Sequence, residues 1–153
     1  MTPIAYFKLQ AKNLLRDYKT KKPVFDEAIN DYLYEYSPTY FDIDGIVCDY
    51  DINEEKFSLM KAQYIIALMA GFDKWADMLK ASEAKLEIGK LLFDNQNKFS
   101  IDDWYFFLDG TEELNNKAFN TEDRLTLFKD VFIKIEAHHN PTGDYLLNKS
   151  QTF

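Results

Sequence analysis

Apolar side chains recur at every third or fourth position along most of this chain, and this spacing restricts its fold more than any other feature. Residues three or four apart lie on one face of an α-helix, so each such segment predicts a helix with one buried face. Helix-capping residues, glycines and prolines mark where these segments begin and end. Together they predict helices over residues 4–18, 24–36, 59–70, 73–80, 82–93 and 100–108, and from Thr121 onward.

The sequence therefore predicts an all-α fold, a single compact domain of six to seven helices over residues 1–139. Residues 39–57 lack helical spacing and contain Gly45, so we expect an irregular acidic loop there. Residues 140–153 contain a proline and a glycine, and we expect a frayed C-terminal tail. No apolar run is long enough to predict a membrane span. A single cysteine, Cys48, forms no internal disulfide and suits a reducing cytoplasm.

Three residues in one short stretch have predicted structural roles. Gly71 follows a predicted helix and supplies a left-handed terminator. Phe72 and Trp75 come directly after it, and we expect both to pack in the cleft between helices.

Ser100 and Asp103 have the spacing of a capping box, which predicts the start of a short aromatic helix ending before Asp109 and Gly110.

The charge is unevenly distributed along the chain. The net charge is −8, yet residues 1–22 carry six basic groups and one acidic group, which gives +5. Four of the basic groups line one face of the first predicted helix: Lys8, Lys12, Arg16 and Lys19. This face predicts a binding site for RNA, an anionic membrane or an acidic protein. An RNA ligand held by Lys8, Lys12 and Arg16 is one alternative, although the acidic balance argues against nucleic acid, and pairing with the chain's own acidic loop is another.

The acidic loop also raises the question of a metal site. Asp49, Asp51 and Asn53 match positions one, three and five of a calcium-binding EF-hand loop. Position six is Glu54 instead of glycine, and position twelve is Met60 instead of glutamate, so the pattern is incomplete. The alternative interpretation is that these oxygens cap helices and face solvent.

Residues suited to catalysis are few. His138 and His139 are the two histidines, and adjacent residues on a helix point about 100° apart, which is poor geometry for one metal. Cys48 lies among apolar residues and is more typical of a small hydrophobic residue than of a nucleophile. No phosphate-binding loop, nucleophile elbow or zinc-binding helix motif occurs, so we predict no cofactor and favour a non-enzyme. The aromatic residues left over from the predicted helix faces, and available for binding, are Tyr6, Tyr34, Tyr40 and Tyr50.

Residues 6–18 and 57–82 resemble a small bacterial helical domain that is found alone or joined to glyoxalase-like proteins. The matching positions are Ala11, Lys12, Leu14, Ser58, Ala62, Ala67, Gly71, Phe72, Trp75 and Leu79. The whole chain also resembles an uncharacterised bacterial family of all-helical proteins of similar length. These resemblances imply a helical fold and bring no catalytic residue.

The leading hypothesis is a non-catalytic cytoplasmic domain that binds a protein or a second copy of itself, with an immunity or antitoxin role as one version. The first alternative is a small-molecule or metal-binding enzyme of unrecognised type that uses the aspartates of residues 42–51 (Asp42, Asp44, Asp49 and Asp51) with His138 or His139. The second alternative is RNA binding through the basic first helix.

Overall fold

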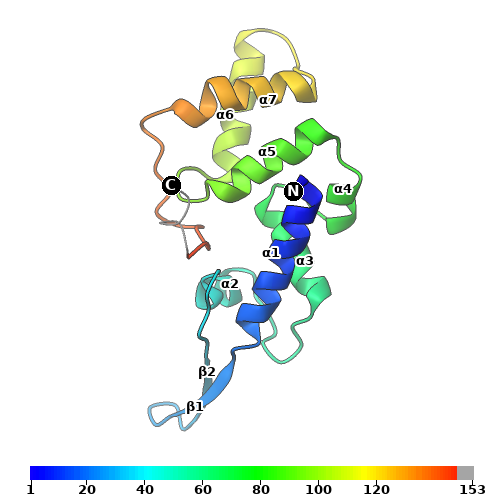
Figure 1. Cartoon of the computed structure of the whole chain (residues 1–153). Helices are drawn as coiled ribbons and strands as arrows, with labels where there is room; N and C mark the ends of the chain where they lie inside the picture. Colours follow the sequence, from blue (N-terminus) through cyan, green and yellow to red (C-terminus); the bar gives the residue numbers. More distant parts are fainter. Residues whose placement is uncertain (148–153) are drawn as a thin grey trace. The chain divides into compact units, whose positions relative to one another are not determined.

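The structure is a computed structural model that describes residues 1–147, and most of this chain is helical (Figure 1). The described residues form seven α-helices, one short 3-10 helix and one pair of antiparallel strands. In chain order these are α1 (Pro3–Tyr18), β1 (Lys22–Asp26), β2 (Asp31–Glu35), α2 (Ile43–Asp49), α3 (Leu59–Met69), α4 (Trp75–Leu79), α5 (Glu83–Asp94), α6 (Ile101–Leu114), α7 (Thr121–Asp130) and η1 (Phe132–Lys134). None of the described helices is long and apolar enough to cross a membrane.

The prediction of a helix over residues 24–36 is wrong, because this segment forms most of a β-hairpin. The pairs Lys22–Glu35, Val24–Leu33 and Asp26–Asp31 lie directly opposite one another. Aromatic and branched side chains favour extended strands, and the residues between the strands favour a turn. Asp26 Oδ1 accepts the backbone N–H of Ala28 at 2.9 Å, and Asn30 takes a left-handed φ of 52°. The fold is therefore mostly helical but not all-α.

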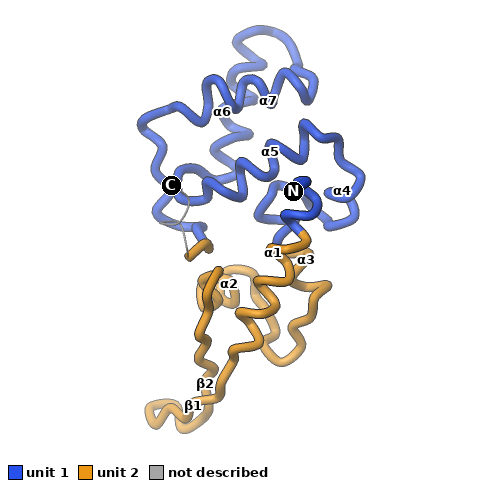
Figure 2. The backbone as a smooth tube through the Cα atoms, in the orientation of Figure 1, with its two compact units in different colours: residues 1–7, 66–144 blue, residues 8–65, 145–153 orange. Residues whose placement is uncertain are grey.

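The chain divides into two compact units (Figure 2). Unit 1 contains residues 1–7 and 66–144, and unit 2 contains residues 8–65 and 145–153. We predicted one domain over residues 1–139. That prediction stays a prediction.

Unit 1 has an aromatic core between α5, α6 and α7. Its buried members are Ile88, Leu92, Phe99, Trp104, Leu108, Phe128 and Phe132. The predicted capping box at the start of α6 is confirmed, with Ser100 and Asp103 each bonding the other's backbone. The helix runs on to Leu114 instead of ending near Asp109, because Gly110 is accommodated within it. Gly71 has the predicted left-handed φ, at 88°, and Phe72 is buried, whereas Trp75 is only half-buried.

Two glycines in the helices of unit 1 have opposite surroundings. A Cβ added at Gly89 in α5 would lie 2.9 Å from Phe72 Cε2 and 3.0 Å from the backbone oxygen of Ala70, whereas a Cβ at Gly110 would meet nothing within 4 Å. We expect Gly89→Ala to destabilise the protein by about 1–3 kcal/mol through overpacking. Gly110→Ala should stabilise it by about 0.5–1 kcal/mol through helix propensity. Urea unfolding measures the change in the free energy of unfolding for each variant. Two changes of the same sign would contradict this packing.

Unit 2 contains most of α1, the hairpin, α2 and the first half of α3. The predicted irregular loop over residues 39–57 is partly wrong, since residues 43–49 form α2. Asp42 caps this helix by accepting the backbone N–H of Gly45 at 3.1 Å. A Cβ at Gly45 would lie 2.6 Å from the Asp42 carboxylate, so glycine makes room for the cap instead of breaking the helix.

The predicted frayed tail is also wrong for its first part. Asn140 Nδ2 donates to the backbone oxygen of Gln96 at 2.6 Å. Further along, the backbone N–H of Asp42 donates to the oxygen of Tyr145, and that of Leu147 to the oxygen of Tyr40, both at 2.9 Å. Residues 140–147 are thus tied to the rest of the chain by hydrogen bonds, while residues 148–153 lie outside the described residues.

Candidate protein-binding surface

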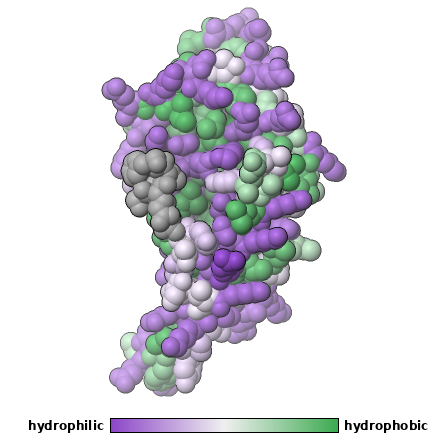
Figure 3. All heavy atoms as spheres, viewed as in Figure 1, coloured by the Kyte–Doolittle hydropathy of each residue, from purple (hydrophilic) through white to green (hydrophobic). Residues whose placement is uncertain are grey.

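The hairpin carries an aromatic face that the described chain leaves open to solvent. Directly opposite residues share a face of a two-stranded sheet, and the register places Pro23, Phe25, Tyr32 and Tyr34 together. We call these four residues the aromatic face. The Phe25 and Tyr32 rings meet edge to face with centroids 5.3 Å apart, yet Tyr32 remains 63% exposed. Figure 3 shows hydrophobic and hydrophilic groups side by side on the hairpin, at the bottom of the view.

The base of the hairpin is held firmly by Lys21. Its Nζ lies 4.4 Å from the centre of the Tyr34 ring and 5.2 Å from that of Tyr18, and it donates to the backbone oxygen of Glu54 at 2.8 Å. The Tyr36 hydroxyl donates to the Glu54 carboxylate, and burial together with this bond raises the Tyr36 pKa well above its usual value. These contacts fix the direction in which the strands extend from the rest of unit 2.

The chain that follows the hairpin is fixed by one buried carboxylate. Asp17 in α1 is 1% exposed and accepts three consecutive backbone N–H groups. Its oxygens lie 3.0 Å from the nitrogen of Thr39, 2.7 Å from that of Tyr40 and 2.8 Å from that of Phe41. Sequence reasoning missed this role, because Asp17 figured only as the one acidic group among six basic groups.

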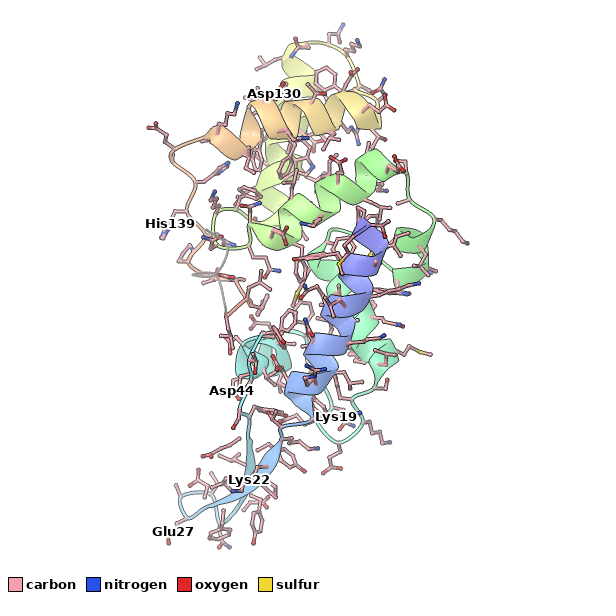
Figure 4. The ribbon with its side chains drawn as sticks, viewed as in Figure 1. Lys19, Lys22, Glu27, Asp44, Asp130 and His139 are labelled. Carbon is pink, nitrogen blue, oxygen red and sulfur yellow. The ribbon has the colours of Figure 1, made fainter. Side chains whose placement is uncertain are left out.

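The tip of the hairpin is acidic. Residues 22–35 contain one basic residue, Lys22, and four acidic residues, which gives −3. Figure 4 labels Lys22 near the base and Glu27 in the turn. Asp26 and Asp31 lie directly opposite one another, and like charges in that position destabilise a strand pair. An isolated two-stranded hairpin is marginally stable. Its aromatic face and acidic tip therefore suit contact with a basic, partly apolar surface better than exposure to water.

The basic residues predicted to bind a partner are all exposed. Lys8, Lys12 and Arg16 lie on one face of α1, and Lys19 directly follows the last residue of this helix. Within residues 1–147, no hydrogen bond or ion pair involves their side chains. Pairing of this face with the chain's own acidic segment is thus not found in the described chain.

The residues predicted to bind a metal have separate structural roles. Asp49, at the end of α2, accepts the Tyr145 hydroxyl at 2.6 Å. Asn53 Oδ1 accepts the backbone N–H of Glu55 at 3.0 Å, and exposed Asp51 adopts a left-handed φ of 49°. No group of three or more His, Cys, Asp or Glu residues suited to a metal ion occurs in the part of the chain that the structure describes.

Each candidate catalytic residue has its own local surroundings. His138 Nε2 lies 2.6 Å from the backbone oxygen of Phe132, and the imidazole packs against the rings of Phe99 and Phe132. His139 is exposed, and Cys48 is exposed on α2. The histidines belong to unit 1, while Cys48 and the aspartates of residues 42–51 belong to unit 2.

The four tyrosines proposed as binding residues are half-buried, and only Tyr34 lies on the aromatic face. Tyr6 donates its hydroxyl to Asp94 in unit 1. Tyr50 packs against Tyr145, and burial, aided by the nearby Asp49 charge, raises the Tyr50 pKa to about 12. The exposed aromatic residues of the hairpin are instead Phe25 and Tyr32, which the sequence pattern had assigned to a helix core.

Unit 1 also has an open groove of about 700 Å³. Its walls combine Phe72, Ile101 and Tyr105 with charged residues of both signs, namely Asp73, Asp77, Lys80, Lys85 and Asp102. Small-molecule sites are typically enclosed and mostly apolar, with few polar groups. This groove lacks that character, so the hairpin is the stronger candidate.

Comparisons with protein-family models, with curated proteins and with solved structures find no match to this chain. The resemblance of residues 6–18 and 57–82 to a bacterial helical domain therefore stays a prediction.

Proposed function

We propose that this chain is a non-catalytic protein-binding module whose contact element is the hairpin of residues 22–35. The observation that carries the proposal is the aromatic face, which is open to solvent although the hairpin is anchored at its base. Exposed aromatic side chains on a rigid support are typical of the residues that dominate binding energy in protein interfaces. Contiguous exposed apolar patches, in contrast to single exposed apolar side chains, often mark interaction sites.

The charge of the hairpin indicates the chemistry of the partner. A net charge of −3 over residues 22–35 favours a basic protein surface, which would relieve the repulsion between Asp26 and Asp31. The partner would also offer an apolar pocket for Phe25 and Tyr32. Neutralisation of a basic toxin by an immunity or antitoxin protein fits this pattern by analogy. A bacterial cytoplasmic setting belongs to the same proposal.

The test compares two double variants of the tagged chain isolated gently from its own cells. Phe25→Ser/Tyr32→Ser alters the aromatic face, and Leu59→Ser/Met60→Ser removes equally exposed apolar groups elsewhere in unit 2. We expect a basic protein to co-isolate with the wild type and with the Leu59/Met60 control. The aromatic-face variant should lose it, because two interface hot spots together contribute at least about 2 kcal/mol, or about 30-fold in Kd.

Native mass spectrometry identifies what remains bound, and circular dichroism shows whether each variant stays folded. Equal retention of the partner by both double variants would contradict the proposal. Isolation of the wild type with a bound metabolite or metal ion, and with no protein, would instead favour the enzyme alternative.

A further inference from the structure

Two helices of the described chain carry exposed strips of opposite charge. The basic strip consists of Lys8, Lys12 and Arg16 on α1 and Lys19 directly after it, spaced four, four and three residues apart. The acidic strip on α6 consists of Asp102, Phe106, Asp109 and Glu113, spaced four, three and four apart. Such spacings keep the members of each strip on one helix face. Helix α6 has five acidic residues and no basic residue.

Neither strip has a partner within residues 1–147. No hydrogen bond or ion pair involves the side chains of Asp102, Asp109 or Glu113, as is also the case for the basic strip. Phe106 in the middle of the acidic strip is 85% exposed, whereas Trp104 and Leu108 on the other side of α6 are buried. Phe106 thus places an aromatic group in the middle of a charged strip, and aromatic residues are enriched in protein interfaces.

The two strips also match in length. Each spans eleven residue steps, which is about 16 Å at 1.5 Å per residue. If the helices lay antiparallel, as their dipoles favour, Lys8 would face Glu113, Lys12 would face Asp109 and Lys19 would face Asp102. Arg16 would then lie against Phe106, and a guanidinium stacks well on an aromatic ring.

We propose that these strips are the two halves of a self-association interface, in which α1 of one copy binds α6 of a second copy. Each copy carries one strip of each charge, so the contact is head to tail and builds a ring or an open chain of copies. The contact is largely ionic at its rim with one aromatic group in the middle, so the assembly responds strongly to salt. The hairpin takes no part in it.

Sedimentation velocity over a range of protein concentrations tests the proposal. We expect the average mass to rise with concentration at about 50 mM salt and to return to that of one chain at about 500 mM, where screening is strong. Lys8→Glu/Lys12→Glu and Asp109→Lys/Glu113→Lys should each raise the dissociation constant at least about tenfold, because like charges then face one another. The chain carrying all four substitutions should associate again, because the charges are then exchanged.

The control Lys98→Glu/Lys134→Glu changes the net charge as much as Lys8→Glu/Lys12→Glu does, and both of its residues are exposed outside the strips. This control should associate like the wild type. The aromatic-face variant Phe25→Ser/Tyr32→Ser should also associate like the wild type, so that this proposal and the proposed function can be refuted independently. A single chain at every concentration in low salt would overturn the inference, as would failure of the fourfold variant to recover. A chain that gains mass only when RNA or polylysine is added would assign the strips to foreign partners and would overturn it too.

Discussion

Replacement of Trp104 by alanine should lower the free energy of unfolding by about 3–5 kcal/mol, the range for truncation of a buried aromatic residue. Trp104 is 2% exposed, and its ring meets those of Phe128 and Phe132 with centroids 4.7 Å and 5.2 Å apart. Alanine would leave a cavity at the point where α6, α7 and η1 pack together. Urea unfolding followed by circular dichroism measures the loss, which is large for a domain of ordinary stability.

Trp75→Ala is the matched control for this prediction. Trp75 is only half-buried and lies outside the buried aromatic cluster of unit 1, so we expect a loss of about 1–2 kcal/mol. The sequence pattern favoured Trp75 as the core tryptophan, since Gly71 and Phe72 precede it. Equal losses for the two tryptophans would contradict the packing described for Trp104.

Asp17→Ala should destabilise unit 2 by about 3 kcal/mol or more, because hydrogen bonds to a charged group contribute about 1.5–3 kcal/mol each and three donors would lose their acceptor. Phe41, whose N–H is one of the three, is fully buried, so water does not readily replace the carboxylate. Asp17→Asn should also be costly, because its amide keeps one acceptor oxygen and turns an N–H₂ group toward backbone donors.

Hydrogen exchange measures locally how Asp17 holds the three backbone amides. The amides of Thr39, Tyr40 and Phe41 should exchange slowly in the wild type and much faster in Asp17→Asn. Arg16→Ala is the control, since Arg16 is the exposed neighbour in the same helix turn and should change stability by less than about 0.5 kcal/mol. Unchanged exchange at these three amides in Asp17→Asn would show that the carboxylate does not hold this segment.

The helices of unit 1 followed from local signals in the sequence. The capping box at Ser100 and Asp103 and the terminator at Gly71 each depend on a few neighbouring residues, so their chemistry can be read without knowledge of the tertiary fold. The end of α6 was missed for a related reason. A glycine lowers helix propensity but does not terminate a helix unless the backbone turns left-handed there, and Gly110 continues the helix.

The hairpin was missed because its apolar residues fit two periods at once. Phe25, Ile29 and Tyr32 have helical spacing, but the same segment has β-favouring residues on both sides of a turn that begins at Asp26 and ends at Asn30. Aromatic enrichment and those two turn residues were the signals that favoured strands. The error hid the candidate site, because a helix with these residues on its inner face would have buried Phe25 and Tyr32.

The candidate binding residues on α1 were easier to predict than the role of Asp17. Basic residues spaced four, four and three apart lie on one helix face whatever the tertiary fold, and their exposure follows from their charge. Asp17 required knowledge of which distant backbone amides approach α1. The signal available for it was a single acidic residue three positions after Leu14, on the apolar side of an otherwise basic helix.

Amide hydrogen exchange on the protein complex isolated from cells, compared with the same chain alone, tests the central claim most directly. The claim predicts that the amides of residues 22–35 exchange more slowly in the complex, and that those lining the groove between Leu68 and Tyr105 are unchanged. Unchanged exchange throughout the hairpin, with protection in that groove or elsewhere, would contradict the assignment of the hairpin as the binding element.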